Sequence, residues 1–485
     1  MPVNTKHSEY LNSQDMWNRC NTVIGGEDSV KEAGTKYLPK LANQDDDEYN
    51  AYKQRASFFS ATKRTVEGIV GMIFRRPMRI KFPDLEWIKS AGQGGISLEA
   101  LARKVTKHVI SLGRTGLLLD LKDGESVKPF IVQYGPESII NWRIDDIGGA
   151  EKLSLVVLQE CDQVVDSTDQ FKMISNDRWL VLELNGFDDR GVMISKTPIY
   201  RIQVWRKKKG KGGDDLNSFE IESTKFPKIR GQYLNYIPFV FVNPNDLSVN
   251  IERSPVADLT SINLSHYRNS ADLEHGRHYT ALPTPWVAGF KLNGDEKLTI
   301  GSQVAWVSED PNANAGFLEF TGQGLHALEE ALTQKENQMA VLGARLLESQ
   351  KNLVESGDTQ RQRKVGEDSI IATIAGTIDL AFVQVLSWAK EWLSKTGDVE
   401  VELNKDYSAI IIDPQMITAL LGALQSGRIS WDTFVYNLAK GEVLPDGRTA
   451  EQELELINNF PGMPIPGNEM DLDEEEEEIE EEENK

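Results

Sequence analysis

The order of sequence periods in residues 253–395 constrains the fold more than any other feature. The first segment, 253–282, has helical character and ends at Pro283 and Pro285. Proline lacks an amide donor and restricts the residue before it, so this pair stops a helix. Residues 286–320 then change to short apolar runs separated by Gly, Asn, Asp and Pro, which predicts short strands and turns.

Helical spacing returns after this strand module, with apolar residues in steps of three, four and seven. They form a heptad seam in which Lys335 is the one polar member. The apolar members are Leu325, Leu328, Leu332, Met339, Leu342 and Leu346. A polar break at 348–364 precedes a second amphipathic stretch, 371–392, which predicts another long helix. This plan is unusual for an enzyme core and suits a subunit that projects a stalk.

At 485 residues, with 40% hydrophobic and 26% charged residues, the chain has the composition of a soluble, folded protein of about two to four domains. The most apolar stretch, 370–393, is interrupted by Asp379, Lys390 and Glu391, so it predicts a packed helix and not a membrane span. The first residues lack the basic and then apolar pattern of a secretory signal. We therefore expect the protein to stay in the cytosol of the cell that makes it.

The net charge of −22 argues against tight binding to nucleic acid. Residues 471–485 hold eleven acids and one lysine, so they contribute −10, and the other 470 residues carry −12. Proteins that grip DNA phosphates use many Lys and Arg contacts. If nucleic acid is a partner, the contact must be loose or confined to a few basic positions.

Two local clusters of basic residues stand out in this acidic chain. One lies around the polar break before the long helix and consists of Lys351, Arg361, Arg363 and Lys364. These residues either form the solvated start of a helix or contact phosphates without reading bases. The other cluster, 207–211, is interrupted and followed by glycines, which is typical of a flexible hairpin tip.

The sequence before residue 250 predicts a mixed domain of helices and strands. Residues 1–50 are polar and irregular apart from a short helix at 10–20. The next helix is expected from 49 to about 74, where Gly68 and Gly71 predict close packing of another element. Evenly spaced strands between 116 and 206 predict a mainly antiparallel sheet. Further elements are expected as a helix at 97–112 and a strand at 236–243.

The sequence after residue 395 predicts a strand and then a compact group of short helices. The strand is expected at 399–403, and the helices at 413–424, 430–438 and 449–457. A Pro- and Gly-rich linker follows at 461–467. The acidic tail after it is expected to be disordered, because its like charges repel and it has little apolar surface to bury.

No catalytic motif is present. The chain lacks a GxxxxGK[ST] phosphate loop, a GxGxxG after a strand and a GxSxG elbow. The histidine cluster of His275 and His278, with His266 upstream, does not have the HExxH spacing, so a polar helix face or a subunit contact is expected instead of a metal site. Cys20 and Cys161 are isolated thiols. We therefore predict no catalytic residues, no metal and no cofactor.

Four stretches resemble a known family when taken in order. Residues 52–77 look like the first long helix of a wing domain, and 236–243 with the helix ending in Ala-Leu-Pro-Thr-Pro-Trp286 look like the start of a stem. Residues 355–374 resemble a tunnel loop and the helix after it. Residues 427–445 resemble the C-terminal helical segment of a podophage and siphophage branch whose domain was long labelled as of unknown function. Across about 45–460, the chain resembles the portal proteins of tailed bacteriophages.

This resemblance implies an α+β portal-type subunit with a mixed α/β wing, a helical stem, a small α/β clip and a helical C-terminal crown. The implied segments are an N-terminal arm at 1–45, a wing at 46–250, a stem helix at 251–282, a clip at 283–321, a second stem helix at 322–347, a tunnel loop at 348–364, the long wing helix and a strand at 365–412, a crown-like segment at 413–460 and a disordered acidic tail at 461–485.

The resemblance also implies a function in the virion. The expected assembly is a ring of twelve copies at one capsid vertex, put together in the host cytoplasm, through which double-stranded DNA is packaged and ejected. The implied partners are the terminase large subunit, the major capsid protein and the head-to-tail connector, with no membrane. The resemblance implies DNA contact in the tunnel loop by Lys351, Arg361, Arg363 and Lys364. Candidate docking residues of the clip are Trp286, Trp306 and Phe317.

Two other classes of function stay open at this point. One is a different virion assembly protein, such as an adaptor or scaffold, without a DNA channel. The other is an enzyme whose site the motif search misses, although we expect the chain not to be an enzyme. The mass of the oligomer separates the portal from the first alternative, and nucleotide hydrolysis by the purified chain would favour the second.

Overall fold

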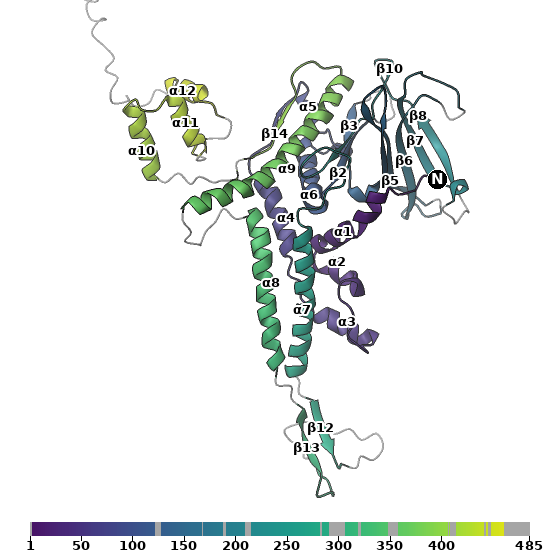
Figure 1. Ribbon diagram of the computed structural model, residues 1–485, viewed down its shortest axis with the longest axis vertical. Helices are drawn as coiled ribbons and strands as arrows, with labels where there is room; N and C mark the ends of the chain where they lie inside the picture. Colours follow the sequence, from purple (N-terminus) through teal and green to yellow (C-terminus); the bar gives the residue numbers. More distant parts are fainter. Residues whose placement is uncertain are drawn as a thin grey trace, which may run out of the picture. The chain divides into compact units, whose positions relative to one another are not determined.

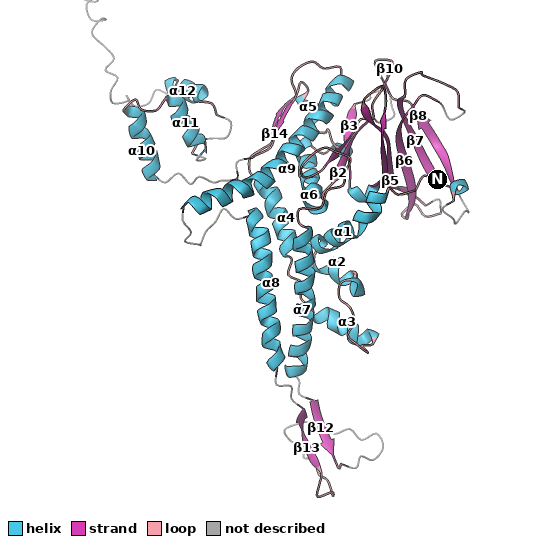
Figure 2. Ribbon diagram, in the orientation of Figure 1, coloured by secondary structure: helices cyan, strands magenta, loops and turns pink. Residues whose placement is uncertain are grey.

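The computed structural model describes residues 2–121, 128–166, 168–187, 191–208, 215–281, 284–290, 306–318, 322–347, 357–405, 407, 414–440, 443–444 and 448–459. The chain divides into two compact units, Met1–Tyr407 and Ser408–Lys485. The first unit combines helices with antiparallel sheets, and the described part of the second is helical (Figures 1 and 2). The predicted α+β class is therefore confirmed.

Helix α9 (Gly357–Trp392) is the central core helix of the first unit. It packs against α6 (Leu98–Leu112) and a three-stranded sheet, whose order β11-β2-β3 joins Phe239–Val242, Thr115–Leu121 and Pro129–Tyr134. The predicted inner face of α9 is buried at Ile371, Ile374, Ile378, Phe382 and Val385. The segment Ile370–Trp392 is long and apolar enough to cross a membrane, yet 56% of its most apolar window is buried, as in the core helix of a folded unit.

A five-stranded antiparallel sheet with the order β4-β5-β6-β7-β8 lies on the other side of this three-stranded sheet from α9 (Figure 1). Its strands are Ile139–Asp146, Glu151–Val165, Met173–Asn185, Ile199–Lys207 and Phe219–Lys225. The sequence correctly predicts β5, β6 and β7 and misses the two edge strands. Edge strand β8 is mostly exposed, so its sequence, Phe-Glu-Ile-Glu-Ser-Thr-Lys, has little apolar content to mark it as a strand.

Part of the segment expected as an N-terminal arm, 1–45, contributes to the core. Helix α1 (Ser8–Gly25) includes the predicted helix and is followed by α2 (Glu27–Glu32). Trp17 and Cys20 on α1 are completely buried, and the Trp17 indole Nε1 donates to the Leu112 carbonyl at 3.0 Å. The N-terminal segment has too few apolar residues for this packing to be predicted from its mostly polar sequence.

The single helix predicted from 49 to about 74 is in fact two helices, α3 (Asp46–Arg55) and α4 (Ala61–Ile73). The break is held by the buried side chain of Asn263. Its amide donates to the Phe59 carbonyl at 2.8 Å and accepts from the Thr62 amide and hydroxyl at 3.2 and 2.9 Å. The close packing predicted at Gly71 is also wrong, because a Cβ there would meet nothing within 4 Å.

Shorter elements complete the first unit. Strand β1 (Arg79–Lys81) pairs with β14 (Glu400–Glu402), and β9 (Lys228–Ile229) pairs with β10 (Gln232–Tyr233). Helix α5 (Leu85–Ile88) precedes α6, which ends at Gly113 with a left-handed φ of 77°. Glycine is required there both by this φ and by the Glu252 carbonyl, which would lie 2.6 Å from a Cβ.

The described part of the second unit contains three short helices: α10 (Pro414–Gln425), α11 (Trp431–Lys440) and α12 (Ala450–Asn458). All three lie where the sequence predicts them. A capping box fixes the start of α12, with Thr449 and Gln452 each accepting from the other's backbone amide. Helix α11 contacts both α10 and α12, and the Trp431 indole Nε1 donates to the Ala450 carbonyl at 3.2 Å.

Candidate functional site

The candidate site is the helix pair α7 (Ala257–Ala281) and α8 (Gln323–Leu347) with the β-hairpin that connects them (Figure 1). The two helices lie side by side and run antiparallel, because late residues of α7 meet early residues of α8. Three polar contacts cross the pair: Arg277 Nη2 to Glu329 Oε1 at 2.8 Å, Lys335 Nζ to the Ser265 carbonyl at 3.2 Å, and His266 Nε2 to Glu336 Oε1 at 3.2 Å.

The predicted heptad seam faces α7. Met339 is buried, Lys335 is half-buried, and the Lys335 ammonium is satisfied by the Ser265 carbonyl. Burial, followed by the nearby positive charge of Arg268, lowers the pKa of Lys335. At the distal end of the pair, Gly276 lets Leu325 pack tightly, because a Cβ on Gly276 would lie 2.5 Å from Leu325 Cδ2.

The side of α7 away from α8 packs on α3. The Tyr52 hydroxyl donates to Asp272 Oδ1 at 2.6 Å, and the Tyr52 ring meets the His275 ring edge-on at 5.2 Å. Burial and this hydrogen bond raise the pKa of Tyr52. Burial and the Arg55 guanidinium, 3.3 Å from His275 Nδ1, lower the pKa of His275. This part of the histidine cluster is therefore a helix–helix contact within the chain.

No group of three His, Cys, Asp or Glu side chains that could hold a metal is found in the part of the chain that the structure describes. The second histidine of the cluster, His278, is exposed beside the Tyr279 ring at 5.7 Å. The third, His266, is buried against Phe59 and paired with Glu336. His275 and His278 both contact the Tyr279 ring, whereas His266 has a separate set of neighbours.

The hairpin consists of β12 (Thr284–Ala288) and β13 (Asn314–Leu318), paired antiparallel with Trp286 opposite Gly316. Of the predicted docking residues, Trp286 is 43% exposed and Phe317 is 55% exposed, and both lie on this hairpin. The third, Trp306, is half-buried in the segment that precedes β13. Within the described residues, Trp286 and Phe317 are therefore partly exposed, and their role in docking stays a prediction.

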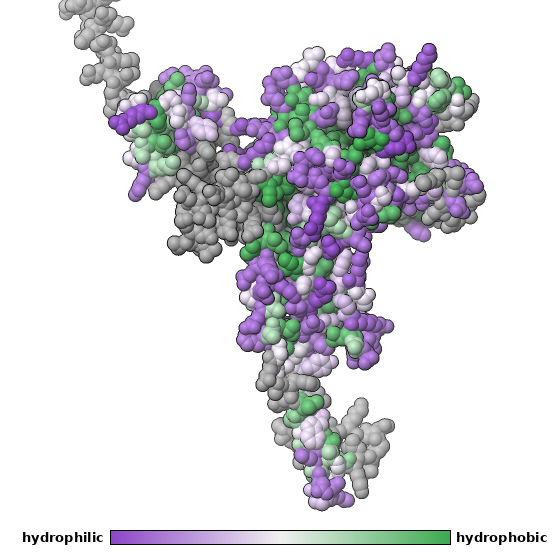
Figure 3. All heavy atoms as spheres, in the orientation of Figure 1, coloured by the Kyte–Doolittle hydropathy of each residue, from purple (hydrophilic) through white to green (hydrophobic). Residues whose placement is uncertain are grey.

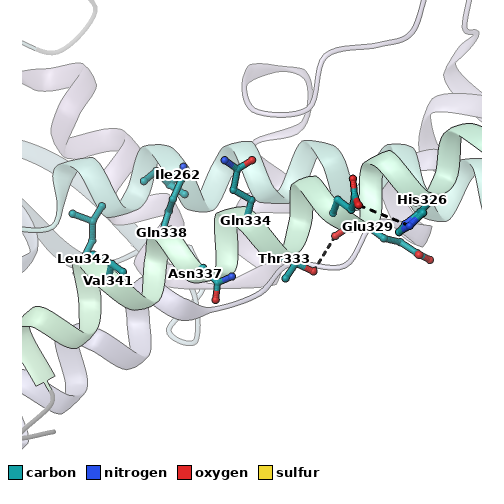
Figure 4. A pocket seen from close by; sticks show the side chains of 10 residues that line it. Ile262, His326, Glu329, Thr333, Gln334, Asn337, Gln338, Val341 and Leu342 are labelled. Atoms are coloured by element: carbon teal, nitrogen blue, oxygen red, sulfur yellow. Dashed lines mark hydrogen bonds and ion pairs between the residues drawn. The ribbon is translucent and has the colours of Figure 1, made fainter. Parts of the chain in front are cut away.

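A shallow groove of about 930 Å³ runs along α8 beside the seam and is lined by α8 residues together with Ile262 of α7 (Figure 4). Its described lining contains carboxylates, amides and apolar groups but no Lys or Arg. The lining residues are Ile262, His326, Glu329, Glu330, Thr333, Gln334, Asn337, Gln338, Val341 and Leu342. Sequence reasoning misses this groove, although its α8 residues recur at helical spacing next to the seam, whose member Leu342 also lines it.

The basic residues of the predicted tunnel loop are only partly placed. Lys351 lies outside the described residues. Arg361, Arg363 and Lys364 lie in helix α9, which begins at Gly357, so the predicted loop at 348–364 extends too far. Residues 357–364 are polar and lack an apolar period, yet Gln, Arg and Lys are good helix formers. The side chains of these basic residues are outside the described part, so their contact with DNA stays a prediction.

Comparison with known proteins gives a partial family match. The model of a family described as a domain of unknown function (DUF4055) matches residues 255–393, from the start of α7 to just beyond α9. No curated protein matches the chain.

Solved structures with a low similarity include "Neck of empty GTA particle computed with C6 symmetry", with a TM-score of 0.39, 10% identity and coverage of 87% of this chain and 99% of that chain. "Virion of native gene transfer agent (GTA) particle" has a TM-score of 0.41 and 10% identity, and the match covers 87% of this chain and 99% of that chain. "Neck of native GTA particle computed with C12 symmetry" has a TM-score of 0.37 and 8% identity, and the match covers 90% of this chain and 99% of that chain. At these TM-scores the likeness does not decide the fold or the function.

Proposed function

We propose that this chain is a virion component of the portal type, which forms a ring at one capsid vertex through which double-stranded DNA is packaged and ejected. One observation carries the proposal. An antiparallel pair of long helices projects from a mixed α/β unit and ends in a small β-hairpin, and a long core helix follows the pair in sequence (Figure 1). This is the order of stem, clip and wing that the sequence resemblance implies.

The dimensions of the helix pair suit a channel wall. Each helix has 25 residues, which at the usual rise corresponds to roughly 37 Å of α-helix. The seam, the Arg277–Glu329 ion pair and the close approach at Gly276 hold the two helices together as one rod. Such rods placed side by side around an axis would enclose a passage.

The chemistry of the open α8 face suits a DNA that has to move. Carboxylates and amides line its groove, and no Lys or Arg occurs in the described lining. A wall rich in Lys and Arg would bind the DNA backbone with a steep salt dependence and slow its passage. In this proposal the few basic positions, Lys351, Arg361, Arg363 and Lys364, make only transient phosphate contacts.

The exposed hairpin provides a place for partners to dock. Trp286 and Phe317 present aromatic surface of the kind that anchors protein interfaces. We assign this hairpin, together with Trp306, to contact with the terminase large subunit during packaging and with the head-to-tail connector afterwards. The major capsid protein would surround the ring. Hydrolysis of ATP falls to the terminase, and the chain itself acts without cofactor or catalysis.

Electron microscopy of the purified full chain tests this proposal. We expect ring-shaped particles with a central hole, twelve-fold in the simplest case, after negative staining. Light scattering on the same sample should give a mass of many subunits. Only monomers or dimers at assembly concentrations would overturn the proposal.

A further inference from the structure

The C-terminal unit exposes apolar side chains that a soluble helical unit normally buries. Among its described residues only Phe434 and Val435, both on α11, are buried apolar side chains. Exposed apolar residues occur on all three helices and include Met416 and Leu421 on α10, Tyr436 on α11, and Leu454, Leu456 and Ile457 on α12, with exposed fractions from 41% to 65%. Apolar residues reach the surface of this unit in the space-filling view (Figure 3).

Helix α10 differs from the rest of the chain in its charge. It spans Pro414–Gln425 and contains no Asp, Glu, Lys or Arg, whereas 26% of the whole chain is charged. None of its described side chains is buried. Depletion of charge together with exposed apolar residues is the composition of an interface core. A helix of 12 residues is also too short to cross a membrane.

We propose that α10, together with the exposed apolar residues of α12, is a contact between neighbouring copies of this chain. The inference rests on the proposed ring, in which each C-terminal unit has the same unit of the next copy as its neighbour. The contact would be head-to-tail, with α10 of one copy against a different surface of the next, because a ring is closed by heterologous interfaces.

The charge of the chain favours a second copy as the occupant. Two chains of net charge −22 repel each other, and this repulsion is strongest where carboxylates face carboxylates. An uncharged helix is a surface on which two such copies can meet without that cost. A basic partner protein, by contrast, would favour the carboxylates of α12, such as Glu451 and Glu453, over the uncharged α10.

Hydrogen exchange on the full-length protein, read by mass spectrometry, tests the contact. Unassembled subunits and rings are separated by size and labelled under the same conditions. We expect backbone amides in 414–425 and 450–458 to exchange at least about tenfold more slowly in the ring. Equal exchange in both states would overturn the inference, whether both are slow because the same chain covers α10 or both are fast because it stays open.

A matched pair of substitutions gives an independent readout. Leu421→Glu adds one negative charge to α10, and Leu85→Glu adds one to an exposed leucine of the first unit. We expect Leu421→Glu to weaken assembly and remove the ring-dependent protection, while Leu85→Glu changes neither. Circular dichroism of the unassembled variants checks that both fold. Rings with unchanged protection in Leu421→Glu would overturn the inference alone, whereas the absence of rings in the wild type would overturn both proposals.

Discussion

Helices α9 and α10 show two ways in which an apolar helix is used in this molecule. Over its described side chains, α9 turns a continuous buried face to the core of the first unit, from Ile371 to Ala389. Helix α10 is the most uniformly uncharged helix of the second unit, and none of its described side chains is buried. The first unit therefore has a continuous core, whereas the described helices of the second leave apolar side chains exposed. Apolar content alone does not distinguish the two cases.

The largest expected effect is on the core of the first unit. Phe382 on α9 is completely buried, and Phe382→Ala should lower the free energy of unfolding by about 3–5 kcal/mol, through lost burial and the cavity left behind. The matched change in the second unit, Leu456→Ala, removes a side chain that is 49% exposed and should cost less than about 1 kcal/mol. Denaturant titration of the unassembled chain measures both, and equal losses would contradict the comparison.

The next effect concerns the break between α3 and α4. Asn263→Ala removes a buried amide and leaves the Thr62 amide and hydroxyl without the oxygen that accepts from both, at about 1–3 kcal/mol for each buried group left unpaired. The capping residue of the second unit, Thr449, is the matched polar site, and Thr449→Ala should cost about 1 kcal/mol. Thermal unfolding followed by circular dichroism ranks the two variants. A larger loss of stability from Thr449→Ala would show that the helix cap of the second unit contributes more than the buried amide of the first, contrary to the prediction.

Substitutions at two helical glycines should change stability by smaller amounts and in opposite directions. Gly276→Val places a branched side chain against Leu325 between α7 and α8 and should destabilise the pair by about 1–3 kcal/mol. At Gly422 on α10 a Cβ would meet nothing within 4 Å, so Gly422→Ala should stabilise the unassembled chain by up to about 1 kcal/mol through helix propensity. Calorimetry of both variants checks the signs. A loss of stability in Gly422→Ala would mean that α10 is already covered.

Local patterns predicted much of the fold, and long-range contacts account for most of what they missed. The seam of α8, the inner face of α9 and the three C-terminal helices follow from periodicity and from start signals such as Pro414 of α10. The break between α3 and α4 depends on Asn263, about 200 residues away in sequence, and the place of α1 in the core depends on Trp17 reaching Leu112. No local pattern carries such information. For the candidate site, the helix pair and the exposed Trp286 and Phe317 were predictable, but the groove on α8 was not singled out.

The smallest expected effect is a pH dependence of the stability of the first unit, which arises because an ionisable carboxyl group is buried there. Burial raises the pKa of Asp379, and the Lys405 ammonium at 2.9 Å and the Leu403 amide only partly offset this. The folded state then holds the proton more tightly than the unfolded chain, whose aspartates titrate near about 3.9. Stability therefore falls as the pH rises from this value through the raised pKa. In Asp379→Asn the loss is absent, so the unfolding free energy of the variant relative to wild type should increase across that window and then level off.

Denaturant titrations at a series of pH values measure this difference. A difference that falls as the pH rises would show that Lys405 outweighs burial and that the carboxylate is the favoured form in the fold, and a flat difference would show that the two effects cancel; either result would contradict the prediction.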